Sequence, residues 1–327
     1  MTTKEKVLEV LERHRGTYVS GEMLAAELHA SRAAVWKAIT ALRAEGYQIQ
    51  GVNKRGYALS GDTDRLTAAG IGACLSPALS EKIEICAYDS VDSTNNEAKR
   101  RIAAGVGALS PDRALLIVAE RQTAGRGRMG RSFYSPGGSG LYMSFVFTAA
   151  ASLADAVGIT GAASVAVVRA IRACTGKEAA IKWVNDVLLD GKKVCGILTE
   201  AVTSLENGHT GQIVVGIGIN CGAAEFPEEV ASVAGSVGEV RRCALCAAVT
   251  EELYGFMQQL TQRPWMEEYR RASAVLGKEI RCIQGEHSFL ATALEIDESG
   301  GLVVRRADGT CETLHSGEIS IRFQEKS

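Results

Sequence analysis

Apolar residues in the first 60 positions recur every three or four residues, which is the spacing of one face of an α-helix. The spacing predicts a helix over residues 4–15, a second helix that begins after Ser20, and a third over residues 32–44 that begins after Ser31. Serine is a favoured N-cap because its hydroxyl accepts a hydrogen bond from a free amide of the first turn. Two short β-type runs follow, around a turn at residues 53–56. This order of elements predicts a winged helix-turn-helix.

The pattern changes after a polar linker at residues 60–64. Residues 65–265 alternate apolar strand runs with helical segments, and the longest helix is predicted over residues 153–173. The predicted strands are Ala114–Ala119, Ala180–Val184, Val187–Leu189, Val194–Leu198 and Gln212–Ile219, and residues 241–260 are predicted to be helical. The strands Val187–Leu189 and Val194–Leu198 are predicted to form a hairpin that turns over residues 190–193. This alternation predicts a mixed β-sheet covered by helices.

Short strands separated by glycine turns return near the C-terminus. They are predicted at Glu279–Ile283, Phe289–Ile296, Leu302–Arg306, Cys311–Leu314 and Ile319–Phe323. Strands this short and closely spaced predict a small β-barrel. We therefore expect an α+β protein with three domains, at residues 1–62, 63–272 and 273–327.

Composition narrows the class of protein. Of the 327 residues, 46% are hydrophobic and 23% are charged, which excludes wholesale disorder. No window approaches 18 uninterrupted apolar residues, and no apolar region follows the N-terminal charges, so neither a membrane span nor a signal peptide is expected. Nine cysteines are an odd number without framework spacing and fit reduced thiols in a cytoplasm. Cys243 and Cys246 have C-x-x-C spacing, but a helical pattern without a nearby His argues against a metal site.

The net charge of −2 is unevenly distributed. Residues 1–60 hold nine Lys and Arg against six Glu, a net of +3, and the remainder holds 27 basic and 32 acidic residues. A basic head on an acidic body suggests that the head alone meets a polyanion. The third helix turns polar side chains of the phosphate-pairing and base-reading types away from its apolar stripe. The candidate DNA contacts are Ser31, Arg32, Trp36, Lys37, Thr40 and Arg43, with Lys54 and Arg55 of the hairpin tip.

Another interpretation of this head is a plain three-helix bundle with a solvated polar face. The basic hairpin tip argues against it, because the tip is a second, independent basic element. Trp36 either touches DNA or packs on the hairpin, and packing is the more frequent fate of a tryptophan.

Four arginines are interleaved with glycines between residues 121 and 131. The run matches the glycine pattern of a dinucleotide-binding turn, but residues 132–138 cannot open a helix, so no helix N-terminus is available for a pyrophosphate. Arginines on a flexible backbone instead form a multidentate site for an anion such as a polyphosphate or an acyl-phosphate. The alternative is a solvated basic loop that binds nucleic acid non-specifically.

The run Lys182-Trp183-Val184-Asn185-Asp186 ends a predicted strand. A lysine at a strand end beside a large aromatic can be partly desolvated, and it can then neutralise charge that develops on a transferring group. Asn185 and Asp186 either orient a metal–phosphate or simply form the turn.

Two polar segments lie at the ends of other elements. Ser93-Thr94-Asn95 can saturate the hydrogen bonds of a small polar headgroup, cap a helix over residues 96–104, or do both. Gly216 and Gly218 lie in a strand that ends at Asn220, and their missing side chains allow a ligand close to the backbone.

Together these segments resemble one family, the bifunctional biotin–protein ligases that also act as the biotin operon repressor. The resemblance covers nearly the whole chain, in order, through SRAAVWKAITALRAEGY, GVNKRGYALS, DSTNNEA, AERQTAGRGRMGRSFYSPGGSGLYMS, IKWVNDVLL, KVCGILTE, VVGIGIN and HSGEISIRF. The glycine–arginine run, the KW-x-ND run and GIGIN are specific as a set. One departure is Val184, where the family usually has proline. Valine keeps an extended backbone, so we expect a slightly looser hairpin with its chemistry intact.

The resemblance implies both a fold and a reaction. The fold is a winged helix-turn-helix, a central ligase core like that of class II synthetases, and an SH3-like C-terminal barrel. In the reaction, the biotin carboxylate attacks the α-phosphate of ATP with Mg²⁺ assisting, which gives biotinyl-5′-AMP and pyrophosphate. A lysine of the biotin carboxyl carrier protein of acetyl-CoA carboxylase then attacks the mixed anhydride and releases AMP. Both steps build negative charge that arginine and lysine offset.

The resemblance also implies the roles of individual residues. Lys182 and Arg128 are the implied catalytic residues, and Lys182 bridges the biotin carboxylate and the α-phosphate. The implied biotin contacts are Ser93, Thr94, Asn95, Gln122, Arg126, Gly127, Arg128 and Lys182. The implied contacts of ATP or the adenylate are Arg126, Arg128, Arg131, Lys182, Asn185 and Asn220. No protein metal ligand is assigned beyond Mg²⁺ carried by ATP near Asn220.

By the same resemblance the adenylate is a corepressor. It favours a homodimer, formed by pairing of sheet edges, that places two recognition helices on a palindromic operator DNA. The expected location is the cytoplasm, with no membrane partner. Two other functions stay open: a regulator that binds biotin or a nucleotide without ligating, and a lipoate-type acyl ligase. The regulator needs neither the arginine loop nor Lys182, and the basic head and C-terminal barrel argue against the lipoate-type ligase.

Overall fold

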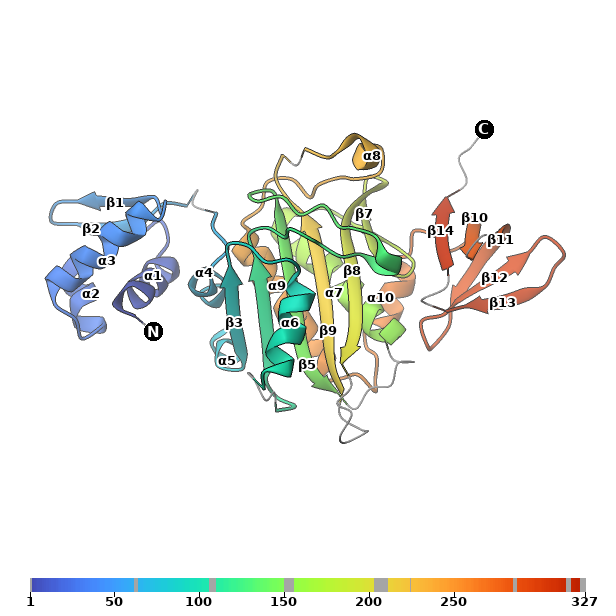
Figure 1. The fold of residues 1–327 in the computed structure, drawn as a ribbon, viewed down its shortest axis with the longest axis horizontal. Coiled ribbons are helices and arrows are strands. Elements are labelled where there is room, and N and C mark those ends of the chain that lie inside the picture. The colour runs from blue at the N-terminus through green and yellow to red at the C-terminus, as the bar shows by residue number, and fades with distance from the viewer. Residues whose placement is uncertain are drawn as a thin grey trace.

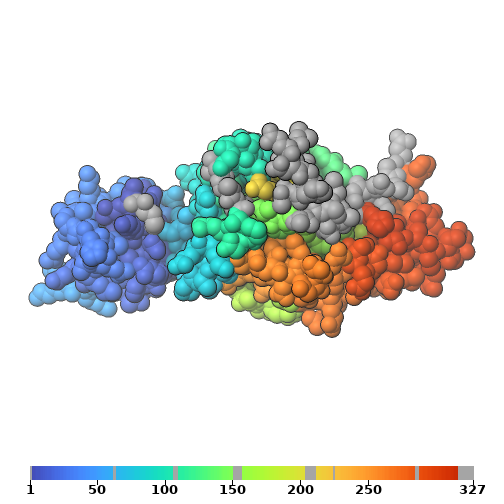
Figure 2. All heavy atoms as spheres, turned by 90° about the horizontal axis from the view of Figure 1, so that it is seen from below, coloured from blue at the N-terminus to red at the C-terminus, as the bar shows by residue number. Residues whose placement is uncertain are grey.

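The computed structural model describes residues 2–61, 64–105, 110–149, 156–202, 211–223, 225–284, 287–315 and 319–323. Three bodies follow one another along the longest axis of the molecule: a helical head, a central sheet with its helices, and a small C-terminal sheet (Figure 1). The space-filling view shows the same order, with the head against the segment that carries α4 (Ala68–Gly72) and α5 (Pro77–Ser80) (Figure 2).

The head contains three helices followed by a hairpin. They are α1 (Thr3–Arg13), α2 (Gly21–Glu27) and α3 (Arg32–Ala44), then β1 (Ile49–Val52) paired antiparallel with β2 (Gly56–Leu59). The hydroxyls of Ser20 and Ser31 accept hydrogen bonds from backbone amides of the next turn at 3.0 and 3.1 Å, so both predicted N-caps are confirmed. Apolar side chains from the three helices and the hairpin form one core. The predicted order of elements is therefore confirmed.

The central sheet has seven strands in the order β3-β4-β5-β9-β8-β7-β6. Their bounds are β3 Ile83–Tyr88, β4 Ala114–Ala119, β5 Gly140–Ala149, β6 Ala180–Lys182, β7 Asp186–Leu189, β8 Lys192–Val202 and β9 Gly211–Asn220. Strands β3 and β4 pair parallel and every other neighbouring pair is antiparallel. The sheet is mixed, as predicted.

Helices cover both faces of this sheet. Helices α7 (Ala156–Thr175) and α9 (Arg242–Met257) cover one face and α6 (Thr94–Ala103) covers the other (Figure 1). Alternate residues of β4 therefore enter different cores: Leu116 packs with α7 and α9, whereas Leu115 packs with α6. Burial on both faces explains why every residue of β4 is apolar.

Helix α7 is long and apolar enough to cross a membrane by length and composition. However, 72% of its most apolar stretch is buried in the protein, which is the situation of a core helix. The start of the helix predicted over residues 153–173 lies outside the described residues up to position 155.

Several predicted boundaries of the central body are wrong, including those of the strand predicted over Val194–Leu198, which spans Lys192–Val202. The strand predicted to reach Val184 ends at Lys182, and the helix predicted over residues 241–260 ends at Met257. The hairpin predicted to turn over four residues turns over two, because Asp190 and Gly191 both take positive φ, at 51° and 77°. Two consecutive positive φ values fit the tight hairpin turn whose twist matches the flanking strands.

The C-terminal body is a five-stranded antiparallel sheet in the order β13-β12-β11-β10-β14. Its strands are β10 Glu279–Gln284, β11 His287–Ile296, β12 Leu302–Arg306, β13 Cys311–Leu314 and β14 Ile319–Phe323, close to the predicted positions. Buried side chains of β10, β11 and β12 belong to the same hydrophobic core as the central sheet. The helix α10 (Met266–Arg271) precedes this sheet.

Polar contacts join the head to the central body. The Glu12 side chain is 1% exposed and pairs with Arg15 of the head at 2.6 Å and with Arg241 at 2.9 Å. The next residue, Arg242, pairs with Asp64 of the predicted linker at 2.6 Å. Residues 62 and 63, where the first domain boundary was predicted, lie outside the described residues.

Candidate functional site

The N-terminus of α6 places three short polar side chains against the sheet. Helix α6 begins at Thr94 after Ser93, and Ser93, Thr94 and Asn95 are 2–4% exposed. The Ser93 hydroxyl makes no capping hydrogen bond, so this predicted capping interaction is not formed. Polar groups buried at this depth require partners, which the neighbouring strands and loops supply.

A chain of hydrogen bonds connects Thr94 to the loop after β4. The Thr94 amide and hydroxyl both donate to Gln122 Oε1, at 2.9 and 3.2 Å. Gln122 Nε2 then donates to the Ser135 hydroxyl at 2.9 Å, which in turn donates to the Phe133 carbonyl. These bonds fix the orientation of the Gln122 amide beside Thr94, so two predicted biotin contacts lie together.

Asn95 has an amide with a defined orientation. Its Nδ2 donates to the Leu198 carbonyl at 3.2 Å and to Glu200 Oε2 at 2.9 Å, and its Oδ1 accepts from the Ser144 hydroxyl at 2.6 Å. Gly216 makes room for this side chain, because an added Cβ there would lie 2.3 Å from Asn95 Oδ1. Gly218 similarly faces the Phe133 ring. Both glycines therefore face protein side chains in this structure, rather than the open approach to the backbone that the sequence predicts.

Glu200 links Asn95 to two cations. Lys99 pairs with it at 2.6 Å, and Arg126 lies 3.8 Å away. Burial raises the pKa of Glu200, but the hydrogen bonds from Lys99 and Asn95 outweigh burial, and the net pKa is below the ordinary value. The carboxylate is therefore charged at neutral pH and fixes the position of both neighbours.

The glycine–arginine loop contains one short 3-10 turn, η1 (Arg128–Gly130), closed by a hydrogen bond from the Gly127 amide to the Arg131 carbonyl at 2.7 Å. No helix follows it, since the chain runs on to β5, so no helix N-terminus is available for a pyrophosphate. Arg126 donates to Asn96 Oδ1 at 3.1 Å, while the Arg131 side chain is exposed.

Arg128 connects this loop to the segment that follows Lys182. Its guanidinium donates to Asn185 Oδ1 at 3.1 Å, and Asn185 Nδ2 donates to the Ile197 carbonyl. Burial lowers the pKa of Arg128, an effect only partly opposed by Asp186, so an anion bound here would offset a desolvated positive charge. The two motifs that the sequence assigns to phosphate chemistry are in contact.

Lys182 is half-buried at the end of β6, where its backbone pairs with Asp186. The following peptide, Trp183–Val184, is cis. The Val184 carbonyl accepts a hydrogen bond from the buried Tyr269 hydroxyl at 3.2 Å, and Asp186 pairs with Lys193 at 2.6 Å. This segment is thus held by α10 as well as by the hairpin.

Asn220 ends β9 and is 8% exposed. Its Nδ2 donates to the Gly235 carbonyl at 2.9 Å, which leaves Oδ1 as a hard oxygen of the kind that Mg²⁺ prefers. Within the described part of the chain, no group of three or more His, Cys, Asp or Glu could hold a metal.

Cys243, the first cysteine of the C-x-x-C pair, is buried. Burial raises the pKa of its thiol to about 12, so this thiol stays protonated at neutral pH.

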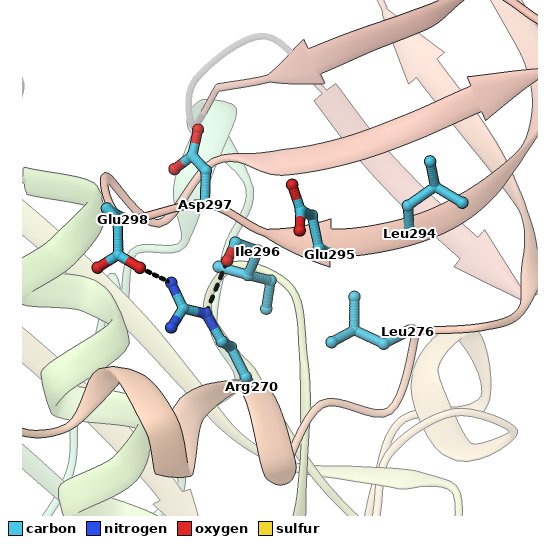
Figure 3. A pocket seen from close by; sticks show the side chains of 7 residues that line it. All are labelled: Arg270, Leu276, Leu294, Glu295, Ile296, Asp297 and Glu298. Carbon is cyan, nitrogen blue, oxygen red and sulfur yellow. Dashed lines mark hydrogen bonds and ion pairs between the residues drawn. The ribbon is translucent and has the colours of Figure 1, made fainter.

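A cavity of about 460 Å³ lies away from these residues, between α10 and the C-terminal sheet (Figure 3). It is lined by Arg270, Leu276 and residues 294–298. None of the predicted site residues lines it.

In the head, all eight predicted DNA contacts are exposed, on α3, its N-cap and the hairpin tip: Ser31, Arg32, Trp36, Lys37, Thr40, Arg43, Lys54 and Arg55. Trp36 is 62% exposed, so of the two alternatives left open for this side chain, packing on the hairpin does not occur, and contact with DNA stays a prediction. Four of the predicted contacts have structural partners. The Ser31 hydroxyl caps α3, the Thr40 hydroxyl donates to the Trp36 carbonyl at 2.9 Å, and the Arg55 guanidinium lies 4.5 Å from the centroid of the Tyr18 ring. Arg43 Nε donates to the Ile49 carbonyl at 2.8 Å. The latter bond joins α3 to the hairpin.

Several residues of the site were not identified from the sequence. Ser144 is a lone hydroxyl in the apolar strand β5, and a single polar residue in a buried strand is a signal for a buried hydrogen bond. Glu200 lies near the end of β8, where strand alternation alone does not distinguish a buried acid from an exposed one. Asn96 and Tyr269 gave no local signal.

These features define a class of protein: a core in which the glycine–arginine loop contacts the segment that follows Lys182, joined to a helix-turn-helix head. Residues 88–220 match the biotin/lipoate A/B protein ligase family, residues 3–58 an HTH domain, and residues 275–322 the biotin protein ligase C terminal domain. The chain belongs to the biotin protein ligase family, among its bifunctional ligase/repressor members.

Relatives span nearly the whole chain. The bifunctional ligase/repressor BirA of Bacillus spizizenii is 30% identical over 333 residues, which cover 98% of this chain and 99% of the relative. That of Escherichia coli is 30% identical, with 95% of each chain covered. Among solved structures, a biotin protein ligase from Aquifex aeolicus in complex with biotin and ATP is similar with a TM-score of 0.60 and 27% identity, over 74% of this chain and 99% of that chain.

Proposed function

We propose that the protein activates biotin with ATP to biotinyl-5′-AMP and transfers the biotin to a lysine of the biotin carboxyl carrier protein of acetyl-CoA carboxylase. The same adenylate is the corepressor that directs the head to operator DNA of the biotin operon. One observation carries the proposal: Arg128 of the glycine–arginine loop contacts Asn185, three residues after Lys182, in a chain that begins with a helix-turn-helix.

The chemistry requires activation because a carboxylate is a poor acyl donor. Lys182 and Arg128 offset the negative charge that develops as the carboxylate attacks the α-phosphate. Arg126, Arg131, Asn185 and Asn220 complete the contacts of the nucleotide and the adenylate.

Biotin binding uses the buried polar groups at the start of α6. The ureido ring of biotin presents two N–H donors and one carbonyl acceptor, which amide and hydroxyl side chains complement. Ser93, Thr94, Asn95 and Gln122 supply these groups, and Gly127 allows the loop to close on the ligand.

Mg²⁺ fits this site as an ion carried by the nucleotide. The described residues offer no cage of acidic ligands, and Asn220 Oδ1 is a single hard oxygen, so most ligands come from phosphates and water. Bound in this way, the ion neutralises phosphate charge.

We further propose domain boundaries at residues 1–62, 63–272 and 273–327, an SH3-like barrel at the C-terminus and a ligase core like that of class II synthetases. In this proposal the protein is cytoplasmic, and the adenylate promotes a homodimer through pairing of sheet edges. A five-stranded antiparallel sheet, in which buried side chains of β10, β11 and β12 join the core of the central body, supports the C-terminal assignment.

The test combines the full chain with biotin, ATP, Mg²⁺ and a carrier domain, and follows pyrophosphate release and carrier mass. Biotin-dependent pyrophosphate release with a carrier adduct supports the proposal. Lipoate in place of biotin distinguishes the related acyl ligase, and binding of biotin without pyrophosphate release would indicate a regulator instead.

A further inference from the structure

The side chain that follows Lys182 contacts the C-terminal sheet. Trp183 is 4% exposed, and its Nε1 donates a hydrogen bond of 2.8 Å to the Gly300 carbonyl, 117 residues further along the chain. Gly300 lies in the turn between β11 and β12. A buried indole N–H that lost this acceptor would pay the cost of an unsatisfied donor, so the bond ties the lysine segment to the turn.

Asp297 organises the turn that presents this carbonyl. Its Oδ1 accepts from the Ser299 amide at 2.8 Å, the Ser299 hydroxyl at 2.6 Å and the Gly301 amide at 2.8 Å. Gly300 has a φ of +88°, which favours glycine, and a Cβ on Gly301 would lie 2.7 Å from Thr313. The Asp297 carboxylate therefore helps to fix the position of the Gly300 carbonyl, together with backbone hydrogen bonds from Gly300 to Asp297 at 3.0 Å and from Asp297 to Gly301 at 2.9 Å.

The same turn is attached to α10. Arg270 Nε donates to the Ile296 carbonyl at 2.8 Å and its guanidinium pairs with Glu298 at 2.6 Å (Figure 3). Arg263 also donates to the Glu298 carbonyl. Since α10 carries Tyr269, which donates to Val184, the turn and the helix hold the lysine segment from two directions.

We propose that Trp183 and Asp297 are positioning residues for adenylate formation: through the Gly300 carbonyl, the C-terminal sheet fixes the backbone that carries Lys182. The inference rests on the proposed function of Lys182. It assigns the C-terminal sheet a specific part in the first half-reaction, although none of its residues need touch biotin or ATP.

The chain offers a matched control for each positioning residue. Trp265 is a second buried tryptophan, 1% exposed, whose Nε1 has no hydrogen-bond partner among the described residues. Asp308 organises another turn of the same sheet by accepting from the Thr310 amide and hydroxyl, but it is exposed. Trp265→Phe and Asp308→Ala therefore reproduce the substitutions without disturbing the hydrogen bond between Trp183 and Gly300.

The experiment measures biotin-dependent ATP–pyrophosphate exchange by the full chain. Misplacement of a reacting group by about 1 Å can cost roughly a hundredfold in rate, so we expect kcat to fall roughly tenfold to a hundredfold in Trp183→Phe and in Asp297→Ala. Because Lys182 acts on charge that develops during attack, kcat falls more than KM for ATP rises. The double variant loses no more than the worse single variant, since both act through one bond.

Three outcomes would overturn the inference: losses that multiply in the double variant, equal losses in Trp265→Phe, or unchanged kcat. Amide hydrogen exchange gives a readout that does not depend on activity. Exchange in a peptide over residues 180–189 rises in Trp183→Phe and Asp297→Ala but not in the controls; an unchanged pattern contradicts the positioning role. A wild-type chain without biotin-dependent exchange of pyrophosphate would instead contradict the proposed function.

Discussion

Glu200→Gln is the sharpest single substitution for testing the proposed biotin site. The wild-type carboxylate accepts hydrogen bonds from Asn95 Nδ2 at 2.9 Å and Lys99 Nζ at 2.6 Å, one on each oxygen. Glutamine has nearly the same shape but replaces one acceptor oxygen with an amino group. That amino group must face either the Asn95 amide or the Lys99 ammonium, both of which are donors.

The cost follows from this mismatch. One partly buried donor loses its acceptor, which costs about 1–3 kcal/mol of unfolding free energy. If Asn95 is the donor that loses its acceptor, it still donates to the Leu198 carbonyl. The loss of unfolding free energy then lies in the lower half of that range. If the Asn95 amide turns over instead, the Ser144 hydroxyl accepts in place of donating, and Asn95 presents an N–H where it presented an oxygen. A biotin N–H would then meet a donor, and we expect roughly tenfold weaker binding, equivalent to about 1.4 kcal/mol.

Calorimetric titration of biotin and denaturant unfolding measure the two effects. Glu84→Gln is the matched control. Glu84 is 46% exposed and lies 3.7 Å from Arg101, and an exposed ion pair of this kind contributes little to the free energy of unfolding. We expect wild-type affinity and stability from the control. A Glu200→Gln variant with the biotin affinity and unfolding free energy of Glu84→Gln would refute this role.

The pH dependence has a defined sign. Because Glu200 has a lowered pKa in the folded chain, its stabilisation is fully present above its ordinary pKa of 4.5 and is lost as the pH falls through the lowered value. The difference in stability between wild type and Glu200→Gln should therefore be constant near neutral pH and shrink only below pH 4.5. A difference that shrinks between pH 8 and pH 6 would show that another group is responsible.

Three further predictions concern the reaction and the head. Lys182→Ala should fold normally but lose most adenylate synthesis, since one positioned donor supplies about 2.7–4 kcal/mol; near-normal pyrophosphate release would contradict its role. Arg128→Gly should still form biotinyl-AMP but release it faster, because the loop loses a charge-assisted contact that keeps it closed. The dissociation rate of preformed adenylate and streptavidin blotting of a bystander protein measure this release. An unchanged dissociation rate would assign Arg128 to synthesis of the adenylate instead. Deletion of residues 1–62 should abolish operator binding in a gel-shift assay, because it removes the helix-turn-helix. It should also weaken biotin binding, because the Glu12–Arg241 contact between the head and the central body is lost. Specific operator binding by the truncated chain would contradict the assignment of DNA binding to the head.

Local patterns predicted most elements of the fold. The third helix of the head was predicted over the observed residues, because serine capping and an apolar stripe mark both its start and its buried face. The turn at Asp190 was predicted too long, because apolar periodicity does not show that two residues with positive φ can reverse the chain.

The site was less accessible to sequence reasoning. The resemblance and the motifs identified Thr94, Gln122 and Arg128, but not the partners that fix them. Glu200 lies 105 residues from Asn95, and Gly300 lies 117 residues from Trp183, and in each pair one backbone or side-chain oxygen is the whole contact. Such single-atom contacts leave no periodicity or composition along the chain, so only the three-dimensional arrangement shows them.

Arg241 and Arg242 are neighbours in sequence whose side chains pair with different bodies. Arg241 pairs with Glu12 of the head, while Arg242 pairs with Asp64 and, at 2.9 Å, with Glu120 at the base of the glycine–arginine loop. A head taken from a relative must therefore supply an acidic side chain at the position of Glu12 to pair with Arg241. A graft that covers Arg241 without supplying a carboxylate would leave its guanidinium without this partner and would destabilise the joined chain. Engineered repressors with new operator specificity are therefore better made by altering the exposed face of α3 than by replacing the head.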